Sequence, residues 1–418
     1  MASTNPPLRH GDEILLECTE MAHRGLALAR VSGLVVFVFG ALPGEEVLAR
    51  VTKIHRRHAF ADTVQVLRSS PHRVEAPCPY FGSCGGCQLQ HLAYRSQLAT
   101  KEAVLRRALL GQGVELPDKL ESVGAADPWR YRWRGEFHRS GEGPVLGFKS
   151  RSSYQVVGVA DCLIHHQTIT EALPAVGAAL GAEGPRLQTV QLTVGEAGAE
   201  LLINTRPDGS GGAKVAGTTA AGLPSAVSVT DEATSLSYRG RDFRVFPDSF
   251  IQVNQGTVER LYETVVEFLG EEIAGAHVVD AYGGIGILSL RLVDLGAQVT
   301  VIESNPVAAR LCQLHAEMYA PGYLTTVCGP VEVELPLAKA ARAVVLDPPR
   351  AGLAPELRSW LAASGPPTVV YLSCEVSALA RDLRSLCQTG AYSVERLRLI
   401  DMFPQTFHFE TVVLLRRM

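Results

Sequence analysis

Residues 278–290, with the sequence VVDAYGGIGILSL, decide the fold of this chain. A short apolar run ends at Asp280, and Gly283, Gly284 and Gly286 follow before a second apolar run begins. The pattern predicts a strand that enters a helix through a tight turn, where the backbone can approach a ligand closely. Taken alone it is weak, because glycine turns also serve the packing of helices on strands.

Strands and helices alternate around this segment from about Arg241 onward. Helices are predicted at 258–269, 287–295 and 306–318, and strands at 277–281, 298–303, 343–347 and 368–373. Strands separated by helices indicate an α/β domain with a parallel, doubly wound sheet. Ligands of such sheets bind beyond the carboxyl ends of the strands, and the polar residues discussed next follow predicted strands.

Two carboxylates indicate the kind of ligand. Glu303 ends the second strand, 23 residues after Asp280, and an acid near this spacing typically binds ribose hydroxyls. The turn reads GGIG and not G-x-G-x-x-G, which disfavours a dinucleotide, whereas an acidic loop suits a cationic sulfonium. These features favour S-adenosylmethionine. Asp347, in the sequence DPPR, suits a planar base held by a hydrogen bond, although Asp-Pro also occurs in plain turns.

The last two strands supply a thiol and an acid. Cys374 follows the strand 368–373 and precedes a helix, so we expect the helix dipole to lower its pKa and make it a nucleophile. A buried packing cysteine is the alternative. In DMFPQTFHFETVVLLRR, residues 401–417, alternation along one strand places Thr406, His408 and Glu410 on one face. A buried Glu410 would have a raised pKa and suit a general base, with a salt bridge at the rim as the alternative.

A thiol, a base and a sulfonium donor together allow one specific reaction. A thiolate that adds to carbon 6 of uracil makes carbon 5 nucleophilic enough to accept a methyl group. A base must then remove the proton of carbon 5 so that the thiol can leave.

Three cysteines lie close together in a loop rich in glycine and proline. Cys78, Cys84 and Cys87 are spaced C-x5-C-x2-C, and Cys162 follows 75 positions after Cys87. A zinc site usually shows two C-x2-C pairs, and this spacing better suits an iron–sulfur cluster. Zinc and no metal remain the alternatives at this point.

The N-terminal part has a different character. Residues 8–68 contain short β-rich runs separated by Gly and Pro, as in a five-stranded barrel, and include the basic stretch Lys53–His58. In PWRYRWRGEFH, residues 128–138, alternation would place Arg130, Arg132 and Arg134 on one strand face for RNA phosphates. A solvated loop and an ordinary half-buried strand are the respective alternatives.

Composition narrows the class of protein. The 418 residues carry a net charge of −4, yet the part up to Ala160 has 20 basic and 15 acidic residues and the remainder has 19 and 28. A basic N-terminal part and an acidic C-terminal part fit an anion-binding module joined to a catalytic one. No signal peptide and no apolar run of about 18 residues is evident, so we expect a cytoplasmic protein with no membrane contact.

These residues together resemble the RNA uracil-5-methyltransferase family, in its branch with an N-terminal TRAM domain and a [4Fe-4S] cluster that methylates 23S ribosomal RNA. The resemblance implies that Cys374 is the nucleophile, Glu410 the base, and Cys78, Cys84, Cys87 and Cys162 the cluster ligands. It implies contacts to S-adenosylmethionine from Gln252 in FIQVN and from Tyr282, Glu303 and Asp347.

The resemblance covers nearly the whole chain. It implies three domains: a TRAM OB-like β-barrel at 1–68, a central β-rich iron–sulfur and RNA-binding domain at 69–240, and a Rossmann-like class I methyltransferase domain at 241–418. We expect a monomer that acts on ribosomal RNA. Transfer RNA as the substrate, and a non-catalytic RNA-binding iron–sulfur protein, are the alternative functions.

Several positions depart from the family pattern. Glu375, Val376 and Ala378 replace the usual acid or amide, Pro and Thr after the nucleophile, which predicts a weaker helix cap. The other departures are Gly284, Ile287, Pro330 and Trp133. None of them removes a reacting group.

Overall fold

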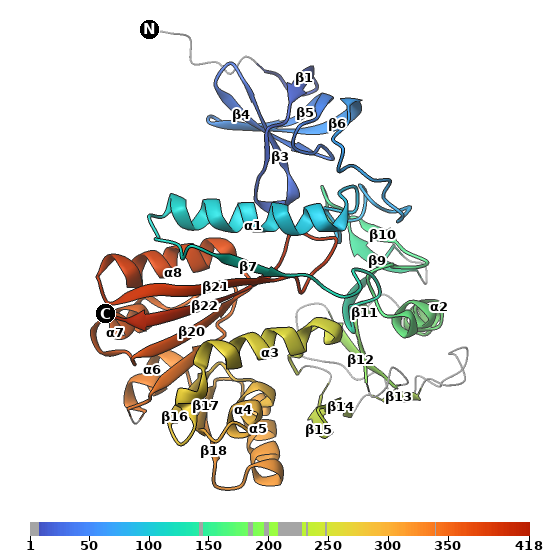
Figure 1. Cartoon of the computed structure of the whole chain (residues 1–418). Helices are drawn as coiled ribbons and strands as arrows, with labels where there is room; N and C mark the ends of the chain where they lie inside the picture. The colour runs from blue at the N-terminus through green and yellow to red at the C-terminus, as the bar shows by residue number, and fades with distance from the viewer. Residues whose placement is uncertain are drawn as a thin grey trace. The chain divides into compact units, whose positions relative to one another are not determined.

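The computed structural model describes residues 8–141, 145–182, 187–195, 200–207, 228–230, 233–246, 249–338 and 340–418 (Figure 1). The chain divides into two compact units. The first comprises Met1–Val104, Lys149–Val157 and Phe403–His408, and the second comprises Leu105–Phe148, Gly158–Met402 and Phe409–Met418. The sequence-based division into three domains follows function and resemblance, whereas this division follows packing.

A curled six-stranded sheet forms the start of the first unit. Its order is β1-β5-β6-β4-β3-β2. The strands are β1 (Glu13–Glu17), β2 (Glu20–Met21), β3 (Ala27–Val31), β4 (Leu34–Phe39), β5 (Glu46–Ile54) and β6 (His58–Arg68), with a 3-10 turn, η1, at His23–Gly25. The prediction of five strands missed β2, which has only two residues and pairs with the start of β3.

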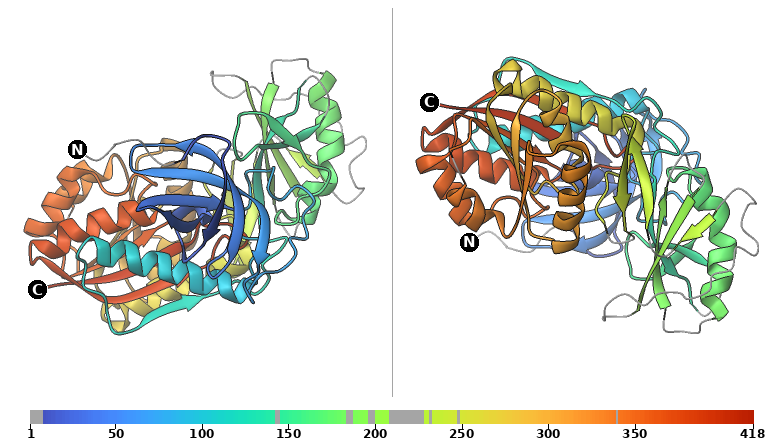
Figure 2. Two further views of the ribbon diagram at one scale, coloured as in Figure 1. Left: turned by 90° about the horizontal axis from the view of Figure 1, so that it is seen from above. Right: turned by 90° about the horizontal axis from the view of Figure 1, so that it is seen from below.

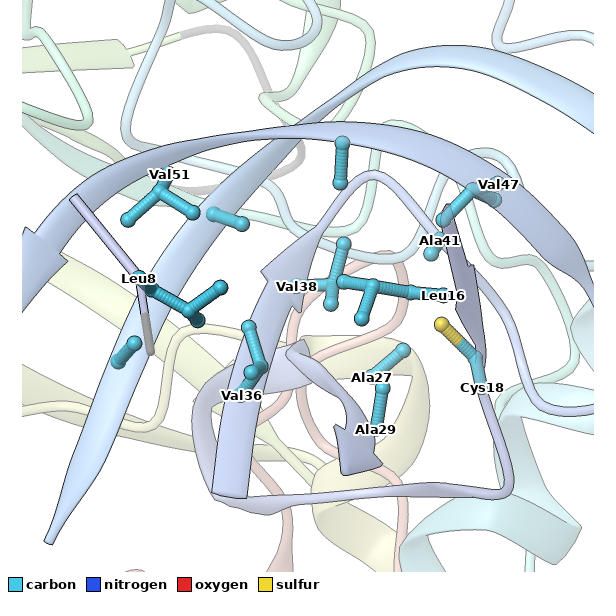
Figure 3. Close-up of a cluster of buried hydrophobic side chains, with 13 residues drawn as sticks. Leu8, Leu16, Cys18, Ala27, Ala29, Val36, Val38, Ala41, Val47 and Val51 are labelled. Carbon is cyan, nitrogen blue, oxygen red and sulfur yellow. The ribbon is translucent and has the colours of Figure 1, made fainter. Parts of the chain in front are cut away.

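Alternating residues of these strands point into one apolar core. Val36 and Val38 of β4, Val47 of β5 and Leu16 of β1 are buried there together with Cys18 (Figure 3). Small residues such as Ala27, Ala29, Ala59 and Ala61 let the strands curl closely around this core. The intervening side chains face away from it, as the period of two along a strand requires.

A buried ion pair joins the turn between β4 and β5 to the loop after β6. The carboxylate of Glu45 is fully buried and accepts bonds of 2.6 and 2.7 Å from the Arg73 guanidinium. The backbone amides of Leu42 and Ser70 also donate to it. These donors lower the pKa of Glu45 despite its burial, so the carboxylate stays charged at neutral pH.

The first unit also contains a segment from near the chain's C-terminus. Helix α1 (Tyr94–Gly111) begins in this unit. The side-chain amide of its Gln97 donates to the side-chain oxygen of Gln405, and the side-chain oxygen of Gln97 accepts from the backbone amide of Gln405. Gln405 has a left-handed backbone, with φ of 67°, and its carbonyl accepts from the amides of Gln88 and Leu89. Lys101 of α1 donates to the carbonyl of Phe403.

The second unit contains an eight-stranded sheet in the order β18-β17-β16-β19-β20-β22-β21-β7. Its strands are β7 (Leu120–Val123), β16 (His277–Ala281), β17 (Gln298–Glu303), β18 (Leu324–Cys328), β19 (Ala343–Leu346), β20 (Thr368–Ser373), β21 (Tyr392–Ile400) and β22 (Glu410–Arg417). The five strands from β18 to β20 are parallel, and β22 runs antiparallel to both β20 and β21.

A helix follows each of the five parallel strands, and a further helix precedes the first of them in the chain (Figure 2). They are α3 (Gln255–Leu269), α4 (Ile287–Val293), α5 (Pro306–Tyr319), α6 (Val331–Leu337), α7 (Pro355–Ser364) and α8 (Val376–Gln388), with a 3-10 turn, η3, at Glu271–Ile273. Helix α3 packs on α4, while α6, α7 and α8 pack on one another in a row. This is the doubly wound, Rossmann-like arrangement that the alternation of strands and helices predicts, extended by an antiparallel strand at β22.

The rest of the second unit is β-rich with one long helix. Strands β9, β8, β11, β12 and β13 lie side by side, and α2 packs against β8 and β11. The elements are β8 (Arg134–Arg139), β9 (Leu146–Lys149), α2 (Gln167–Ala182), β11 (Leu187–Val194), β12 (Glu200–Pro207) and β13 (Ser228–Thr230), then the hairpin β14 (Thr234–Tyr238) and β15 (Arg241–Val245). Strand β10 (Val156–Gly158) lies where the chain passes between units. This part of the chain is β-rich, as expected, and it also contains the helix α2.

Candidate active site

The strand register brings four of the predicted residues to one edge of the sheet. Ala281, the last residue of β16, pairs with Ile302 of β17 and Leu346 of β19, and Leu346 pairs with Tyr371 of β20. Tyr282, Glu303, Asp347 and Cys374 lie at or just beyond the ends of these strands. Because the strands are parallel neighbours, their carboxyl ends form one continuous rim.

Glu410 reaches the same rim from the opposite direction. It is the first residue of β22, which pairs with β20 so that Thr411 lies opposite Ser373. Glu410 and Cys374 therefore flank this pair on adjacent strands. Both are shielded from water, Glu410 almost completely.

The glycine turn after β16 has the tight geometry that its sequence predicts. The backbone at Gly286 is left-handed, and a Cβ there would lie 2.8 Å from the sulfur of Cys312. At Gly283 a Cβ would lie 2.8 Å from Val301. Only glycine avoids both problems, so this turn can pass close to the sheet. Tyr282 also has positive φ, 66°, which is uncommon for a tyrosine and marks the turn as constrained.

Glu303 organises this turn from the next strand. One carboxylate oxygen accepts from the amide of Gly284 at 3.0 Å, and the other accepts from the amide of Asn305 at 2.6 Å. Each oxygen keeps a second lone pair that can accept a further hydrogen bond. The carboxylate is thus fixed in place and can still receive the two hydroxyls of a ribose.

Three carboxyl groups at this edge share a buried environment. Burial raises the pKa of Asp280 to about 6, against a bond from the Ser289 hydroxyl that lowers it, and nearby Glu303 raises it further. Burial and the charge of Asp280 raise the pKa of Asp347 to about 7. Burial and the charge of Asp347 likewise raise the pKa of Glu410 well above its ordinary value. Each shift favours the neutral acid.

The expectation that the helix dipole lowers the pKa of Cys374 was wrong. Burial, the charge of Glu410 and then that of Asp347 raise the pKa of the thiol to about 11. The Arg350 guanidinium acts in the opposite direction on both Cys374 and Glu410. Burial and two neighbouring carboxylates outweigh the partial charge of one helix end, which amounts to about half an elementary charge.

The predicted weakness of the α8 cap is offset within the helix itself. Glu375 is the N-cap residue of α8, and its carboxylate accepts from the amide of Ser377 at 3.4 Å and from its hydroxyl at 2.7 Å. The helix that follows the thiol therefore begins with a side-chain cap, despite the altered sequence.

Two residues near the edge were missed by the sequence analysis. Arg350 is an exposed residue that follows the two prolines of the Asp347 loop. Its place in the DPPR motif could have indicated that it lies near the edge of the sheet. Tyr262 of α3 faces Asp347 and Asp280, which with burial raise the pKa of its hydroxyl. Its place on the helix after FIQVN could have indicated that Tyr262 lies near this edge.

Gln252 lies in the loop before α3. Its backbone carbonyl accepts from the Gln255 side chain at 2.8 Å, and its own side chain is half-buried. Among the described residues, the side-chain amide of Gln252 makes no hydrogen bond to Tyr282, Glu303 or Asp347. The structure thus gathers the strand-end residues and leaves Gln252 as a separate loop position.

Two strand predictions that bear on function were wrong. Residues 403–408 are not a strand, because Gln405 adopts a left-handed backbone, so Thr406 and His408 do not share a strand face with Glu410. Strand β8 begins only at Arg134, and Arg130 has positive φ. The three arginines therefore do not line one face.

Two of these arginines stabilise the fold of the second unit. Arg130 pairs with both oxygens of Asp161, each at 2.7 Å. Arg134 is buried and donates to the Gln191 side chain at 2.8 Å and to the Ser249 carbonyl. Guanidinium groups satisfied in this way are not a surface for RNA phosphates.

The predicted cluster cysteines are not preassembled as a ligand set. Cys78, Cys84 and Cys87 are half-buried in the loop of the first unit, where burial and Cys78 raise the pKa of Cys84. Cys162 belongs to the second unit, with its sulfur 3.1 Å from Nδ1 of His165. None of the nine cysteines forms a disulfide, and the described residues contain no group of three or more metal-binding side chains.

Comparison with known proteins gives the family of this chain. A 23S rRNA (uracil(1939)-C(5))-methyltransferase of Dichelobacter nodosus is 31 % identical to it, over 95 % of this chain and 97 % of that protein. A family model described as tRNA (Uracil-5-)-methyltransferase matches residues 332–418. The chain belongs to the RNA uracil-5-methyltransferase family. An uncharacterized RNA methyltransferase of Caldanaerobacter subterraneus subsp. tengcongensis is also 31 % identical, over 98 % of this chain.

The fold of the methyltransferase is confirmed by a solved structure and a second family model. The crystal structure of Pyrococcus abyssi tRNA (uracil-54, C5)-methyltransferase in complex with S-adenosyl-L-homocysteine has a TM-score of 0.73 and 23 % identity, and covers 96 % of this chain and 100 % of its own. The TRAM domain model matches residues 7–64. The predicted TRAM domain and Rossmann-like methyltransferase domain are both present, and the protein is an RNA methyltransferase. No helix in the described ranges is long and apolar enough to cross a membrane.

The raised pKa of Asp347 predicts how the stability of the methyltransferase depends on pH. Since the pKa is about 7 in the folded state and 3.8 in the reference state, folding favours the protonated acid. The wild type should therefore lose stability as pH rises from about 4 to 7, by on the order of 1–4 kcal/mol. In Asp347→Asn this loss should be smaller, as measured by the thermal midpoint between pH 5 and 8. The exposed Asp118→Asn is the control, and an unchanged pH slope in Asp347→Asn would contradict the assignment.

Proposed function

We propose that this methyltransferase methylates carbon 5 of a uridine in 23S ribosomal RNA, through a transient bond between Cys374 and carbon 6 of the base. The activity for which the Dichelobacter relative is named supports the choice of RNA, since that relative is similar to this chain over nearly its whole length. Transfer RNA is the alternative substrate, because both the family model and the Pyrococcus structure are described by that RNA. We further propose a cytoplasmic monomer.

The adjacency of Cys374 and Glu410 carries this proposal. The pairing of Ser373 with Thr411 sets the thiol and the acid next to this pair, and the charge of Glu410 raises the pKa of Cys374. A nucleophile and a base held on rigid strands meet the first geometric requirement of covalent catalysis. The rim salt bridge considered for Glu410 does not fit its burial.

The proposed reaction proceeds in three steps. The Cys374 thiol loses its proton to solvent, and the thiolate attacks carbon 6, so that an enolate forms and carbon 5 becomes nucleophilic. Carbon 5 would then bond to the methyl group as the bond between that methyl group and the donor's sulfonium sulfur breaks, and the donor would leave as a neutral thioether. Glu410, as a carboxylate, removes the carbon-5 proton, the electrons of that bond re-form the double bond between carbons 5 and 6, and the thiolate of Cys374 leaves. The raised pKa of Glu410 makes it the stronger base for this proton.

Four residues would hold the methyl donor. S-adenosylmethionine supplies an electrophilic methyl group on a cationic sulfonium. Glu303 would accept bonds from the ribose hydroxyls, and the close turn at Gly286 would let backbone approach the ligand. We propose Tyr282, Asp347 and Gln252 as further contacts to the donor, on the strength of the family resemblance.

Arg350 would assist the thiol. It is the residue whose charge lowers the pKa values of both Cys374 and Glu410, opposing Asp347. A nearby cation stabilises the thiolate that must form and the enolate that follows, so its role fits the direction of both shifts.

Replacement of the thiol tests the proposal directly. In Cys374→Ala, methyl transfer should vanish, while RNA binding survives because only the sulfur atom is removed. Unmodified 23S and transfer RNA are offered separately, with methyl incorporation as the measurement. Cys387→Ala is the matched control, since Cys387 is a half-buried thiol on α8, the helix that follows Cys374. Normal turnover in Cys374→Ala would refute the mechanism, and methylation of transfer RNA alone would refute the substrate.

Replacement of the base should trap the covalent intermediate. In Glu410→Gln the carbon-5 proton stays, so elimination of Cys374 should slow by about 100-fold or more and a protein–RNA adduct should accumulate. The adduct is measured by denaturing electrophoresis with labelled RNA. Glu395→Gln, on the neighbouring strand β21, is the control. Rapid turnover without an adduct in Glu410→Gln would assign the base elsewhere.

We also propose that Cys78, Cys84, Cys87 and Cys162 bind a [4Fe-4S] cluster, within a functional part that spans residues 69–240 between the TRAM part at 1–68 and the catalytic part at 241–418. Four cysteine sulfurs are the donor set such clusters use, and the order and spacing of these four match the family. Within the described ranges no three metal-binding side chains are already grouped, so the cluster would organise this loop when it binds. No catalytic step requires it.

The iron content of anaerobically purified protein tests the cluster. Wild type should contain about four iron atoms per chain with a broad visible absorption band, and Cys84→Ser should lose most of both. Cys328→Ser, an exposed cysteine outside the proposed set, should retain them. Iron-free wild type with unchanged methylation would rule out the cluster.

A further inference from the structure

The buried carboxylate of Asp382, on α8, joins three elements near the edge of the eight-stranded sheet. Its side chain has no exposed surface, and one oxygen accepts from the Leu353 amide and from the Tyr371 hydroxyl, both at 2.8 Å. The other oxygen accepts from Arg358 at 3.0 Å and from two nitrogens of Arg381 at 2.9 and 2.7 Å. Charge-assisted bonds from two arginines offset the cost of burying this carboxylate.

One of these elements is the turn that carries Arg350. Residues 349–352 form this turn, and the amide of its last residue donates to the carbonyl of its first at 2.8 Å. The next amide, of Leu353, donates to Asp382. The carbonyls of Ala351 and Leu353 accept from the same two arginines that bind the carboxylate, at 2.7 and 2.6 Å. The backbone of the turn is therefore fixed by one carboxylate and its two guanidinium partners.

Gly352 shows how closely Asp382 lies against this turn. The backbone of Gly352 is left-handed, with φ of 76°, and a Cβ there would lie 2.4 Å from Oδ2 of Asp382 and 2.6 Å from the Arg381 guanidinium. A side chain would push the turn away from both partners, and the left-handed backbone would add strain. The turn thus depends on glycine at this position as long as the carboxylate lies here.

The same carboxylate also binds the strand that leads to the thiol. Tyr371 is a fully buried residue of β20, and Cys374 follows that strand directly. Asp382 therefore contacts the turn of Arg350 and the strand of Cys374 at the same time, and so fixes one relative to the other. The charge of Arg350 acts on both Cys374 and Glu410, so its effect depends on where this turn lies.

We propose that Asp382 is a positioning residue for the reaction, which holds Arg350 beside the reacting thiol and acid. Because Arg350 is itself exposed, the placement of its backbone decides where its guanidinium can reach. Asp382 is buried, so it acts through Arg350 and not by contact with the substrate. This inference rests on the proposed function, in which Cys374 is the nucleophile, and adds the support that a reacting group needs to keep its place.

The rate of Cys374 alkylation by iodoacetamide, followed over a range of pH, tests this link without RNA or methyl donor. Only thiolates react, and peptide mass spectrometry separates Cys374 from the other cysteines. In Asp382→Asn the turn loses its charged partner and Arg350 no longer favours the thiolate, so alkylation at about pH 9 should slow by about 3- to 10-fold. Asp294→Asn is the control, because it removes another carboxylate paired with an arginine, at the end of α4.

The sign of the effect separates positioning from direct electrostatics. The charged groups that act on Cys374 are Glu410 of β22, Asp347 after β19 and Arg350. Removal of a negative charge by itself would favour the thiolate and speed alkylation, whereas displacement of Arg350 would slow it. Faster alkylation in Asp382→Asn would therefore overturn the proposal.

A double-variant cycle separates positioning from general destabilisation. Arg350→Ala should slow alkylation at least as much as Asp382→Asn, and the two changes together should be no slower than Arg350→Ala alone, because the carboxylate acts through that arginine. Effects that multiply in the double variant would overturn the proposal. So would a wild-type alkylation profile in folded Asp382→Asn.

Arg381 supplies the test if Asp382→Asn does not fold. Its side chain is half exposed and binds both Asp382 and the Ala351 carbonyl. Arg381→Ala should slow alkylation in the wild-type background and have no further effect in Arg350→Ala. Arg384→Ala, an exposed position on the same helix, is the matched control, and equal alkylation rates in the two single variants would overturn the proposal. Normal methylation by Cys374→Ala would instead refute the proposed function, and the alkylation result would stand apart from it.

Discussion

The antiparallel pairing of β22 with β20 is the constraint on which the active site depends. In a purely parallel sheet, this edge would carry only residues from the C-terminal ends of strands. Because β22 enters the sheet from the other direction, its first residue, Glu410, arrives beside Cys374, at the end of β20. The backbone hydrogen bonds of two central strands thus fix the spacing of the thiol and the acid.

Burial at this rim sets the chemistry of the groups it brings together. Asp280, Asp347 and Glu410 face one another in a poorly hydrated region, and each favours its neutral form. Such an arrangement opposes folding at neutral pH, and proteins retain it where function requires strained protonation states. Burial, then Glu410 and Asp347, raise the pKa of Cys374 to about 11, so the resting thiol is protonated and unreactive, with Arg350 as the opposing charge.

Two basic stretches of the sequence differ in whether their arginines form ion pairs or hydrogen bonds within the fold. The alternating arginines before β8 appeared suited to phosphate binding, yet Asp161 and Gln191 engage two of them internally. In the part of the chain that the structure describes, Lys53, Arg56 and Arg57 of the basic hairpin have no carboxylate partner, and Phe60 of this hairpin stacks on Phe37 of β4. Charge in the sequence does not distinguish these cases, since the partner of an arginine is chosen by tertiary contacts.

The sequence by itself determined the parallel strands and their helices, since apolar periodicity and the glycine turn act over a few residues. The strand ranges His277–Ala281, Gln298–Glu303 and Thr368–Ser373 match the predictions, and the residues after them lie on the rim as expected. Only the tertiary structure decided the direction of β22, the break at Gln405, the high pKa of Cys374 and the pairing of Arg130. Each of these depends on groups distant in sequence, Gln97 for Gln405 and Glu410 with Asp347 for Cys374, which a local pattern cannot contain.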